Sequence, residues 1–344
     1  MAGTVSWFLL LGYLFTISLY AFTFGAYAAR LFNAPESVGP FIGAGVILAL
    51  GGLNLVGVRE SGIAEDILVI GKMVILGGVA LVGFVAVEPE EAFPVFSSGF
   101  GNAIAAGALI FVAYEGFQLL TYDYADIENH ERNLTRAIWI SIPIVIVIYM
   151  VVAFVTTGSL SNESIAESNE TVLASVAQPV LGRLGLIAVL VAAIASTASA
   201  INATLFASSR LGDRVAEDGQ LPEFLTRWRR GGVPGLFIGT MAIGAIAVEI
   251  TGSLEEITIF SSLVFLLVFA VVNASALAHR VWPGWRRLIP VIGVGGCLAS
   301  AASLSHRLWT TNREALWIVI AITVVLTTLR VGYLLFNNPQ SDHE

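Results

Sequence analysis

The sequence is poor in charge. Only 12% of its 344 residues are Asp, Glu, Lys or Arg, about half of the roughly 25% found in a typical globular domain. By contrast, 56% of the residues are hydrophobic, and the mean hydropathy is +0.83. So few charges cannot cover the surface of a soluble protein of this length. Because the apolar residues form long unbroken runs, and not short segments of alternating hydrophobicity, the composition predicts an all-α membrane protein with many spans.

Other scarce residues exclude further classes of protein. The single cysteine, Cys297, excludes a disulfide framework and a thiolate metal cage. The four histidines lie far apart and outside the apolar runs, so we expect no metal site. The net charge of -8 argues against a nucleic-acid partner. There is no H-E-x-x-H pair, no G-x-S-x-G elbow and no pair of membrane-embedded aspartates, so we expect neither an intramembrane enzyme nor a cofactor.

Ten apolar runs approach the length of about 20 residues that a membrane-spanning helix needs. They lie near residues 7–29, 40–58, 67–87, 103–122, 137–157, 184–205, 235–250, 257–277, 288–304 and 315–336. Loops on the side of the two termini carry 11 arginines, and loops on the opposite side carry 4. Since basic residues accumulate in cytoplasmic loops, we expect a multi-pass protein of the cell membrane with both termini in the cytoplasm.

Two charged residues, Lys72 and Glu115, lie within apolar runs, where insertion of a charge costs on the order of 3 kcal/mol. Lys72 follows the start of its run at Ile67 by five residues. One interpretation is that its ammonium group snorkels to the lipid headgroups. The other is that it faces the protein interior, where it could load and release a proton. Arg330, near the end of the last run, is expected to snorkel.

The fourth run contains Phe111-Val112-Ala113-Tyr114-Glu115-Gly116-Phe117, in which an acid and a glycine interrupt an apolar helix. An unwound turn here would free backbone groups at membrane depth, which is tolerated only where they line a cavity or bind something. Secondary transporters use such half-helix ends to hold small charged substrates. The alternative is a glycine kink packed against a neighbouring helix, with Glu115 paired locally.

The sixth run concentrates small and hydroxyl side chains between Ser196 and Thr204. Such residues allow helices to approach closely, which is their more common use, and they can also ligate an ion.

Four segments in order along the chain resemble the amino acid-polyamine-organocation (APC) superfamily of permeases. They are Asn54, Gly57, Val58, Ser61 and Gly62 followed by Lys72; Phe111 to Phe117; the acidic loop from Ala125 to Ile138; and Ser196-Thr197 followed by Arg210 and Ala216 to Pro222. The chain departs from the family at His130 and Thr135, where the family usually has prolines, so this loop is expected to be less rigid.

The resemblance implies a LeuT-like inverted-repeat fold, in which two sets of five spans enclose a site at the membrane midplane. The similarity begins at the family's third span. We therefore expect one transmembrane domain, 1–344, in which 7–87 holds the last three spans of the first repeat, 103–277 holds the second repeat, and 288–336 holds two additional spans. The family's first two spans have no counterpart, and a separate chain could supply these helices because helices insert first and associate afterwards.

The resemblance also implies roles for individual residues. The expected substrate-binding residues are Phe111, Ala113, Tyr114, Glu115, Gly116 and Phe117. Lys72 is expected near Ser196 and Thr197, where it would take the place of a sodium ion and couple transport to protons. Asp126, Glu128 and Arg136 are candidates for a cytoplasmic gate, although a solvated loop explains them equally well.

The leading hypothesis is therefore a secondary active permease for an amino acid or a related amine, coupled to protons and possibly incomplete. Its expected partners are the small-molecule substrate and the lipid bilayer. The alternative is a non-transporting fragment, or an accessory or scaffold subunit that retains the permease fold.

Overall fold

The computed structural model describes residues 2–57, 62–85, 87, 99–168, 171–230, 232–281 and 283–336, and almost all of them are helical. The α-helices are α1 (Ala2–Leu31), α2 (Gly39–Val56), α3 (Gly62–Val85), α5 (Phe100–Leu109), α6 (His130–Ser159), α7 (Asn162–Ser168), α8 (Val172–Glu217), α9 (Phe224–Arg227), α10 (Gly235–Thr251), α11 (Leu254–Ala278), α12 (Leu288–Thr311) and α13 (Arg313–Phe336). The 3-10 helices are η1 (Glu36–Val38), η2 (Phe111–Tyr114), η3 (Phe117–Asp126) and η5 (Gly284–Arg287). The described strands are β1 (Arg229–Arg230) and β2 (Val233–Pro234), which pair antiparallel.

The predicted all-α, multi-span architecture is confirmed. Within the described ranges, 7 helices are long and apolar enough to cross a bilayer, and three further apolar helices are shorter, namely Val69–Leu81, Phe100–Leu109 and Gly235–Thr251. Together these segments coincide with the ten predicted runs. The fourth run differs from the others because it is divided among α5, η2 and η3.

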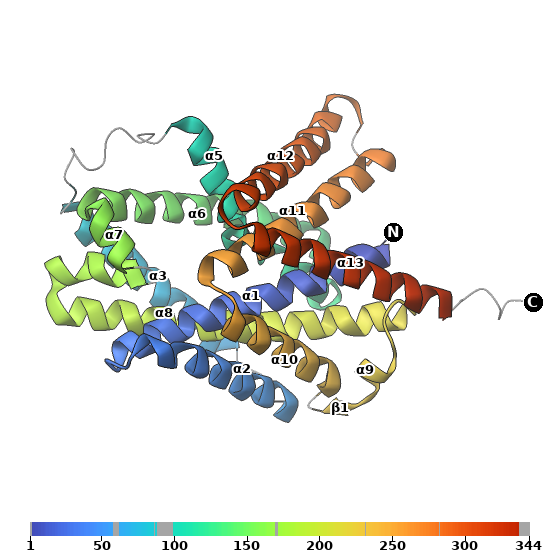
Figure 1. The fold of residues 1–344 in the computed structure, drawn as a ribbon, viewed down its shortest axis with the longest axis horizontal. Helices are drawn as coiled ribbons and strands as arrows, with labels where there is room; N and C mark the ends of the chain where they lie inside the picture. Colours follow the sequence, from blue (N-terminus) through green and yellow to red (C-terminus); the bar gives the residue numbers. More distant parts are fainter. Residues whose placement is uncertain are drawn as a thin grey trace, which may run out of the picture.

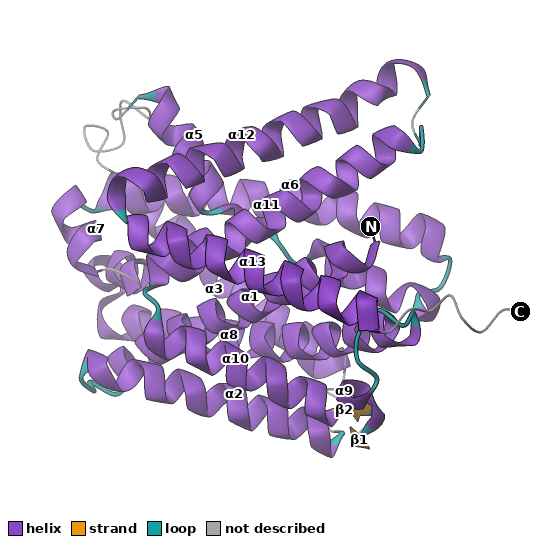
Figure 2. Cartoon of the chain, turned by 45° about the vertical axis from the view of Figure 1, so that its right-hand side comes forward, coloured by secondary structure: helices purple, strands orange, loops and turns teal. Residues whose placement is uncertain are grey.

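Helix α1 runs through the middle of the bundle (Figures 1 and 2) and contacts α2, α8, α10 and α11. Small residues allow this close packing: a β-carbon at Gly12 would lie 3.0 Å from the Phe265 ring of α11, and one at Gly25 would overlap the backbone of Gly39 in α2. The core around α1 includes Tyr13 and Ile17, which are almost completely buried.

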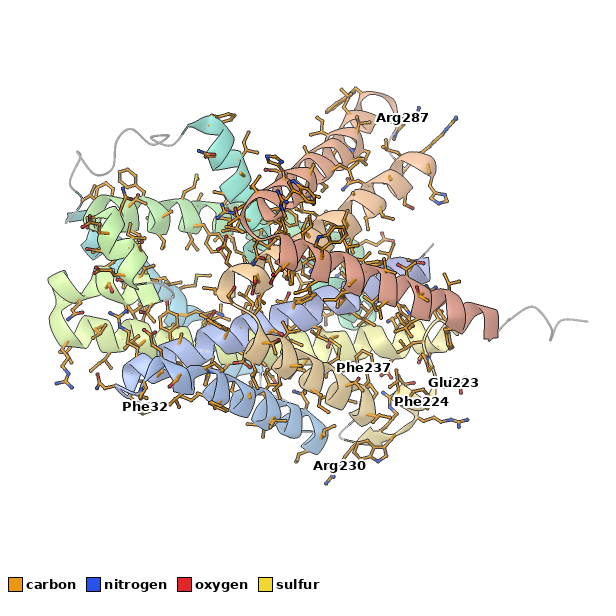
Figure 3. The ribbon with its side chains drawn as sticks, viewed as in Figure 1. Phe32, Glu223, Phe224, Arg230, Phe237 and Arg287 are labelled. Atoms are coloured by element: carbon orange, nitrogen blue, oxygen red, sulfur yellow. The ribbon has the colours of Figure 1, made fainter. Side chains whose placement is uncertain are left out.

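The start of α1, the end of α13 and the loop that contains α9 and β1 lie at one end of the bundle (Figure 1). Figure 3 shows Phe32, which follows α1, at the opposite end from Glu223 and Arg230. The arginine-rich turn formed by Arg227, Arg229 and Arg230 thus lies at the end of the bundle where α1 begins.

The expectation that Arg330 snorkels to the headgroups is wrong. Its side chain on α13 is only 4% exposed. The guanidinium donates to the carbonyl oxygen of Gln220 at 3.1 Å and to the Thr4 hydroxyl at 3.2 Å, and it lies 5.8 Å from the centre of the Trp7 ring. Partners from α1 and from the loop after α8 therefore hold this cation inside the protein.

Candidate functional site

The helix of the fourth run is broken at Glu115 and Gly116, as the sequence predicts. Helix α5 ends at Leu109, a single 3-10 turn covers Phe111–Tyr114, and Glu115 is extended with φ -73° and ψ 162°. Gly116 has φ 118°, a left-handed backbone conformation that residues other than glycine rarely adopt. The chain then continues as η3, so the interruption separates two helical segments and is more than a kink.

Two neighbouring helices satisfy backbone groups that the break frees. The Ser262 hydroxyl of α11 accepts from the amide of Val112 at 3.0 Å and donates to the carbonyl of Leu109 at 2.8 Å. From α6, the Tyr149 hydroxyl donates to the carbonyl of Ala113 at 2.8 Å. An unpaired backbone group is costly at membrane depth, so these contacts stabilise the break in its observed geometry.

Aromatic rings surround the break. Phe117 stacks on Phe269 of α11, with ring centroids 5.8 Å apart and planes 17° apart, and Phe111 meets the same ring edge-on at 6.0 Å. Tyr114 meets Tyr149 of α6 edge-on at 5.2 Å. Phe111 and Phe117, on the two sides of Gly116, are therefore anchored to the same ring of α11, and Tyr114 is anchored to α6.

The Glu115 carboxyl is held beside the break. Its Oε2 accepts from the Gln118 amide at 2.6 Å, and the Oε1 of Gln118 accepts from the backbone amide of Gly116 at 3.0 Å. The second carboxyl oxygen, Oε1, is buried and has no hydrogen-bond partner. This arrangement leaves one acceptor free at the point where the backbone is unwound, which suits a ligand with hydrogen-bond donors.

Several contacts at the break lie outside the sequence prediction. Ser262, Tyr149 and Phe269 come from distant helices, and Gln118 lies just beyond the predicted motif. Near the break, the hydroxyls of Tyr13 in α1 and Tyr122 in η3 lie 2.7 Å apart. Ser262, Tyr149, Phe269 and Tyr13 lie in other apolar runs, where no local feature distinguishes them from ordinary core residues.

The predicted coupling residues lie on two helices that pack together, α3 and α8. Lys72 is partly buried on α3, and Ser196 and Thr197 are partly buried on α8. The Thr197 hydroxyl donates to the carbonyls of Ala193 and Ile194 in its own helix. Among the described residues, no hydrogen bond or ion pair joins Lys72 to either hydroxyl, so its coupling role stays a prediction.

The predicted gate residues lie around the junction of η3 and α6. Glu128 and Arg136 are exposed, and the Glu128 carbonyl accepts from the Asn133 amide at 2.6 Å. Asp126 is the last residue of η3, and its side chain lies outside the described part of the structure. No ion pair joins the described members of this set, so their role as a gate also stays a prediction.

The described ranges contain an apolar cleft apart from the break, and no metal site. No group of three or more His, Cys, Asp or Glu side chains there could hold a metal ion. An apolar cleft of about 380 Å³ lies between α3 and α6, and its lining includes Met73, Phe84 and Val151. None of the residues described at the break lines this cleft.

Comparison with known proteins agrees with this geometry. The chain matches the amino acid permease family over residues 1–342. An uncharacterized protein of Methanocaldococcus jannaschii is 31% identical over 338 residues, which cover 97% of this chain and 77% of the relative. The methylthioribose transporter of Bacillus subtilis is 26% identical over 328 residues, which cover 90% of this chain and 67% of the relative.

A human relative, the large neutral amino acids transporter small subunit 2, is 28% identical over 349 residues, which cover 92% of this chain and 62% of the relative. The two named relatives are transporters and not enzymes. A family match along nearly the whole chain, together with a helix broken at membrane depth, shows that this multi-pass membrane protein belongs to the amino acid permease family of the APC superfamily.

Proposed function

We propose that the chain is a secondary active permease for an amino acid or a related amine, and that its substrate binds at the break between η2 and η3. The observation that carries this proposal is the free, buried oxygen of Glu115 beside an unwound turn. The human relative's name supports an amino acid as the substrate, whereas the name of the Bacillus subtilis relative shows that related transporters also carry other small polar molecules.

The two ends of the break suit the two charged groups of an amino acid. Carbonyl groups collect at the carboxyl end of η2, so this end and Glu115 would attract the substrate ammonium group. The amino end of η3 presents amide groups to a carboxylate. The Gly116 amide already donates to Gln118, so the Gln118 side chain would turn away when the substrate carboxylate binds. Phe111, Tyr114 and Phe117 would then contact the substrate through their rings and backbone.

We also propose that Lys72 couples transport to protons. It is the single lysine of the sequence, it lies partly buried on α3, and α3 packs against the helix that carries Ser196 and Thr197. A protonated Lys72 would attract these hydroxyl oxygens and favour one access state, and a neutral Lys72 would favour the other. Asp126, Glu128 and Arg136 would close the cytoplasmic side.

The sidedness and the division into repeats belong to the same proposal. The arginine-rich turn lies at the same end of the bundle as the start of α1 and the end of α13 (Figure 1), and basic loops favour the cytoplasm. Both termini would accordingly be cytoplasmic, with 7–87 and 103–277 contributing to two repeats and 288–336 lying outside them.

The apolar window of α6 is only 6% buried within the chain, so this face has room for two further helices, whether they belong to this polypeptide or to another.

The test is uptake into proteoliposomes with an imposed pH gradient, using radiolabelled neutral amino acids. We expect accumulation by the wild type and none above the level of empty liposomes with Glu115→Gln. Lys72→Ala should still exchange substrate but lose accumulation driven by the pH gradient. Met73→Ala is the matched control because Met73 neighbours Lys72 and lines the apolar cleft.

Equal accumulation by the wild type and Lys72→Ala would refute the coupling role. The alternative function, a non-transporting subunit, predicts no uptake and no thermal stabilisation of the wild type by any of these substrates. If uptake appears only after co-expression with the first two spans of a relative, the partner proposal is supported.

A further inference from the structure

A second buried acid, Glu249, lies on α10, a helix that contributes no residue to the break. Glu249 is 0% exposed, and neither oxygen of its carboxyl group has a hydrogen-bond partner among the described residues. Burial of an unpaired charge at this depth is costly. A carboxyl in this position therefore needs a partner that the side chains around it do not provide.

The carboxyl group occupies a gap left by a glycine. A β-carbon at Gly43 of α2 would lie 2.7 Å from the carboxyl carbon of Glu249 and would overlap one of its oxygens. The same point lies 2.6 Å from the carbonyl oxygen of Ala21 in α1. An oxygen of Glu249 and the carbonyl oxygen of Ala21 therefore both border the small space that Gly43 leaves open.

The neighbouring turn shows the same contact in a paired form. There, the Ser18 hydroxyl of α1 donates to the carbonyl oxygen of Ala245 in α10 at 2.9 Å. Glu249 follows Ala245 by four residues and Ala21 follows Ser18 by three, so each lies one helical turn further along the same two faces. The Glu249 carboxyl and the Ala21 carbonyl thus continue a row of contacts between α1 and α10, but an ionised Glu249 would bring together two acceptors.

No cation on these helices can resolve this pairing. Helix α2 contains no titratable residue, and Glu249 is the only one on α10. On α1, the titratable residues are three tyrosines and Arg30. The Arg30 guanidinium donates to Thr171, which precedes α8, and to Ser175 of α8, and the Tyr13 hydroxyl pairs with Tyr122. Of the other two tyrosines, Tyr27 packs in the separate core cluster around α8, and Tyr20, a phenol and not a cation, packs against the core cluster that contains Ala21.

Among the described residues, the other elements that contact α10 also donate no hydrogen bond to the Glu249 carboxyl. Helices α8 and α9 and the two strands contact α10. One contact with α8 is that of Gly212 with Phe237. Phe237 lies twelve residues before Glu249, about 18 Å along the helix. In α11, which follows α10, Glu255 pairs with Arg307 and Glu256 caps its own helix at Ser253.

We propose that the Glu249 carboxyl binds a proton. The protonated carboxyl donates a hydrogen bond to the carbonyl oxygen of Ala21, and this bond joins α10 to α1. A hydrogen atom between two acceptor oxygens turns a repulsive contact into a hydrogen bond. A metal ion would need several oxygen ligands, and within the described residues no group of three or more His, Cys, Asp or Glu side chains could hold one. The site is separate from Lys72, and it stabilises the contact of α10 with α1 and does not carry substrate.

Infrared spectroscopy of the full chain in lipid nanodiscs tests the protonated carboxyl directly. We expect the wild type to show the carbonyl-stretch band of a protonated carboxyl at neutral pH, and Glu249→Gln to remove it. Glu115→Gln is the matched control, because Glu115 is the other described acid with a buried, unpaired oxygen, and it must leave the Glu249 band in place. If Glu249→Gln removes only carboxylate bands, the proposal is overturned.

Thermal unfolding of two variants provides a second, independent test. The amide of Glu249→Gln can donate to Ala21 as the protonated acid does, so we expect its unfolding temperature to stay near that of the wild type. Glu249→Leu has a similar volume but no donor, and should unfold at least about 3 °C lower. Equal stability of the two variants contradicts the hydrogen bond. Stabilisation of the wild type by sodium over choline, absent in Glu249→Gln, would identify a sodium site and also overturn the proposal.

Discussion

Replacement of Ser262 by alanine is expected to loosen the break at its most strongly held point. The hydroxyl of Ser262 both accepts from the Val112 amide at 3.0 Å and donates to the Leu109 carbonyl at 2.8 Å. Ser262 is 0% exposed and Val112 is 2% exposed, so water cannot replace the lost partner without a rearrangement. The substitution therefore leaves one backbone donor and one backbone acceptor unpaired inside the protein.

The expected magnitude follows from these two lost bonds. A buried group left without its partner costs about 1–3 kcal/mol, whereas hydrogen bonds between membrane helices average only about 0.6 kcal/mol in double-mutant cycles. With two bonds lost and partial rearrangement, we expect Ser262→Ala to lower the free energy of unfolding by about 1–3 kcal/mol. Because the turn from Phe111 to Tyr114 would move, substrate affinity should also fall.

The neighbouring serine provides a matched control. Ser261 is equally buried, and its hydroxyl lies 3.2 Å from that of Thr16, which keeps a second bond to the Gly12 carbonyl at 2.9 Å. Ser261→Ala removes the same atom but leaves no backbone group unpaired, and should cost at most about 1 kcal/mol. The measurement is reversible unfolding in bicelles, combined with substrate titration. If the two variants lose equal stability, the reasoning about the break is refuted.

Three further perturbations test the structure. Tyr149→Phe frees the Ala113 carbonyl and should raise the half-saturation concentration for uptake by roughly 3–10-fold; an unchanged value would show that this bond does not shape the site. Gly116→Ala should destabilise the protein by about 1–3 kcal/mol. Its φ of 118° is the only cause, because a β-carbon there meets no atom. The control Gly107→Ala, equally uncrowded but inside α5, should be neutral or stabilising. Arg330→Met should cost about 2 kcal/mol and speed limited proteolysis of the loop after α8; unchanged cleavage would contradict the anchoring role of this residue.

Features that depend on neighbouring residues in sequence were predicted well. The ten apolar runs recur as helices, and the break at Glu115 and Gly116 occurs where an acid and a glycine interrupt the fourth run. The local pairing of Glu115, which belonged to the alternative interpretation of a glycine kink, also occurs, in its bond to Gln118. The roles assigned to Lys72, the hydroxyl pair and the gate residues stay predictions, since each depends on states of the transport cycle.

Features that depend on contacts between distant helices were missed. In a helix that is apolar on all sides, periodicity does not reveal which face meets protein and which meets lipid. The sequence around Ser262 and Tyr149 therefore gives no signal of their role at the break. Likewise, nothing in the sequence indicates that Glu249, near the end of an apolar run, is buried between helices. Arg330 was assigned to the headgroups because snorkelling is usual near a span end, but Gln220 and Thr4 hold it inside.

By itself, the sequence determined that the chain must cross a membrane many times and where one span must come apart, because the cost of placing charges and freed backbone groups in lipid depends only on local composition. Which groups complete that opening was decided by the tertiary structure alone. Hydrogen bonds from α11 and α6 and the gap that Gly43 leaves for Glu249 arise only when helices far apart in the chain pack together.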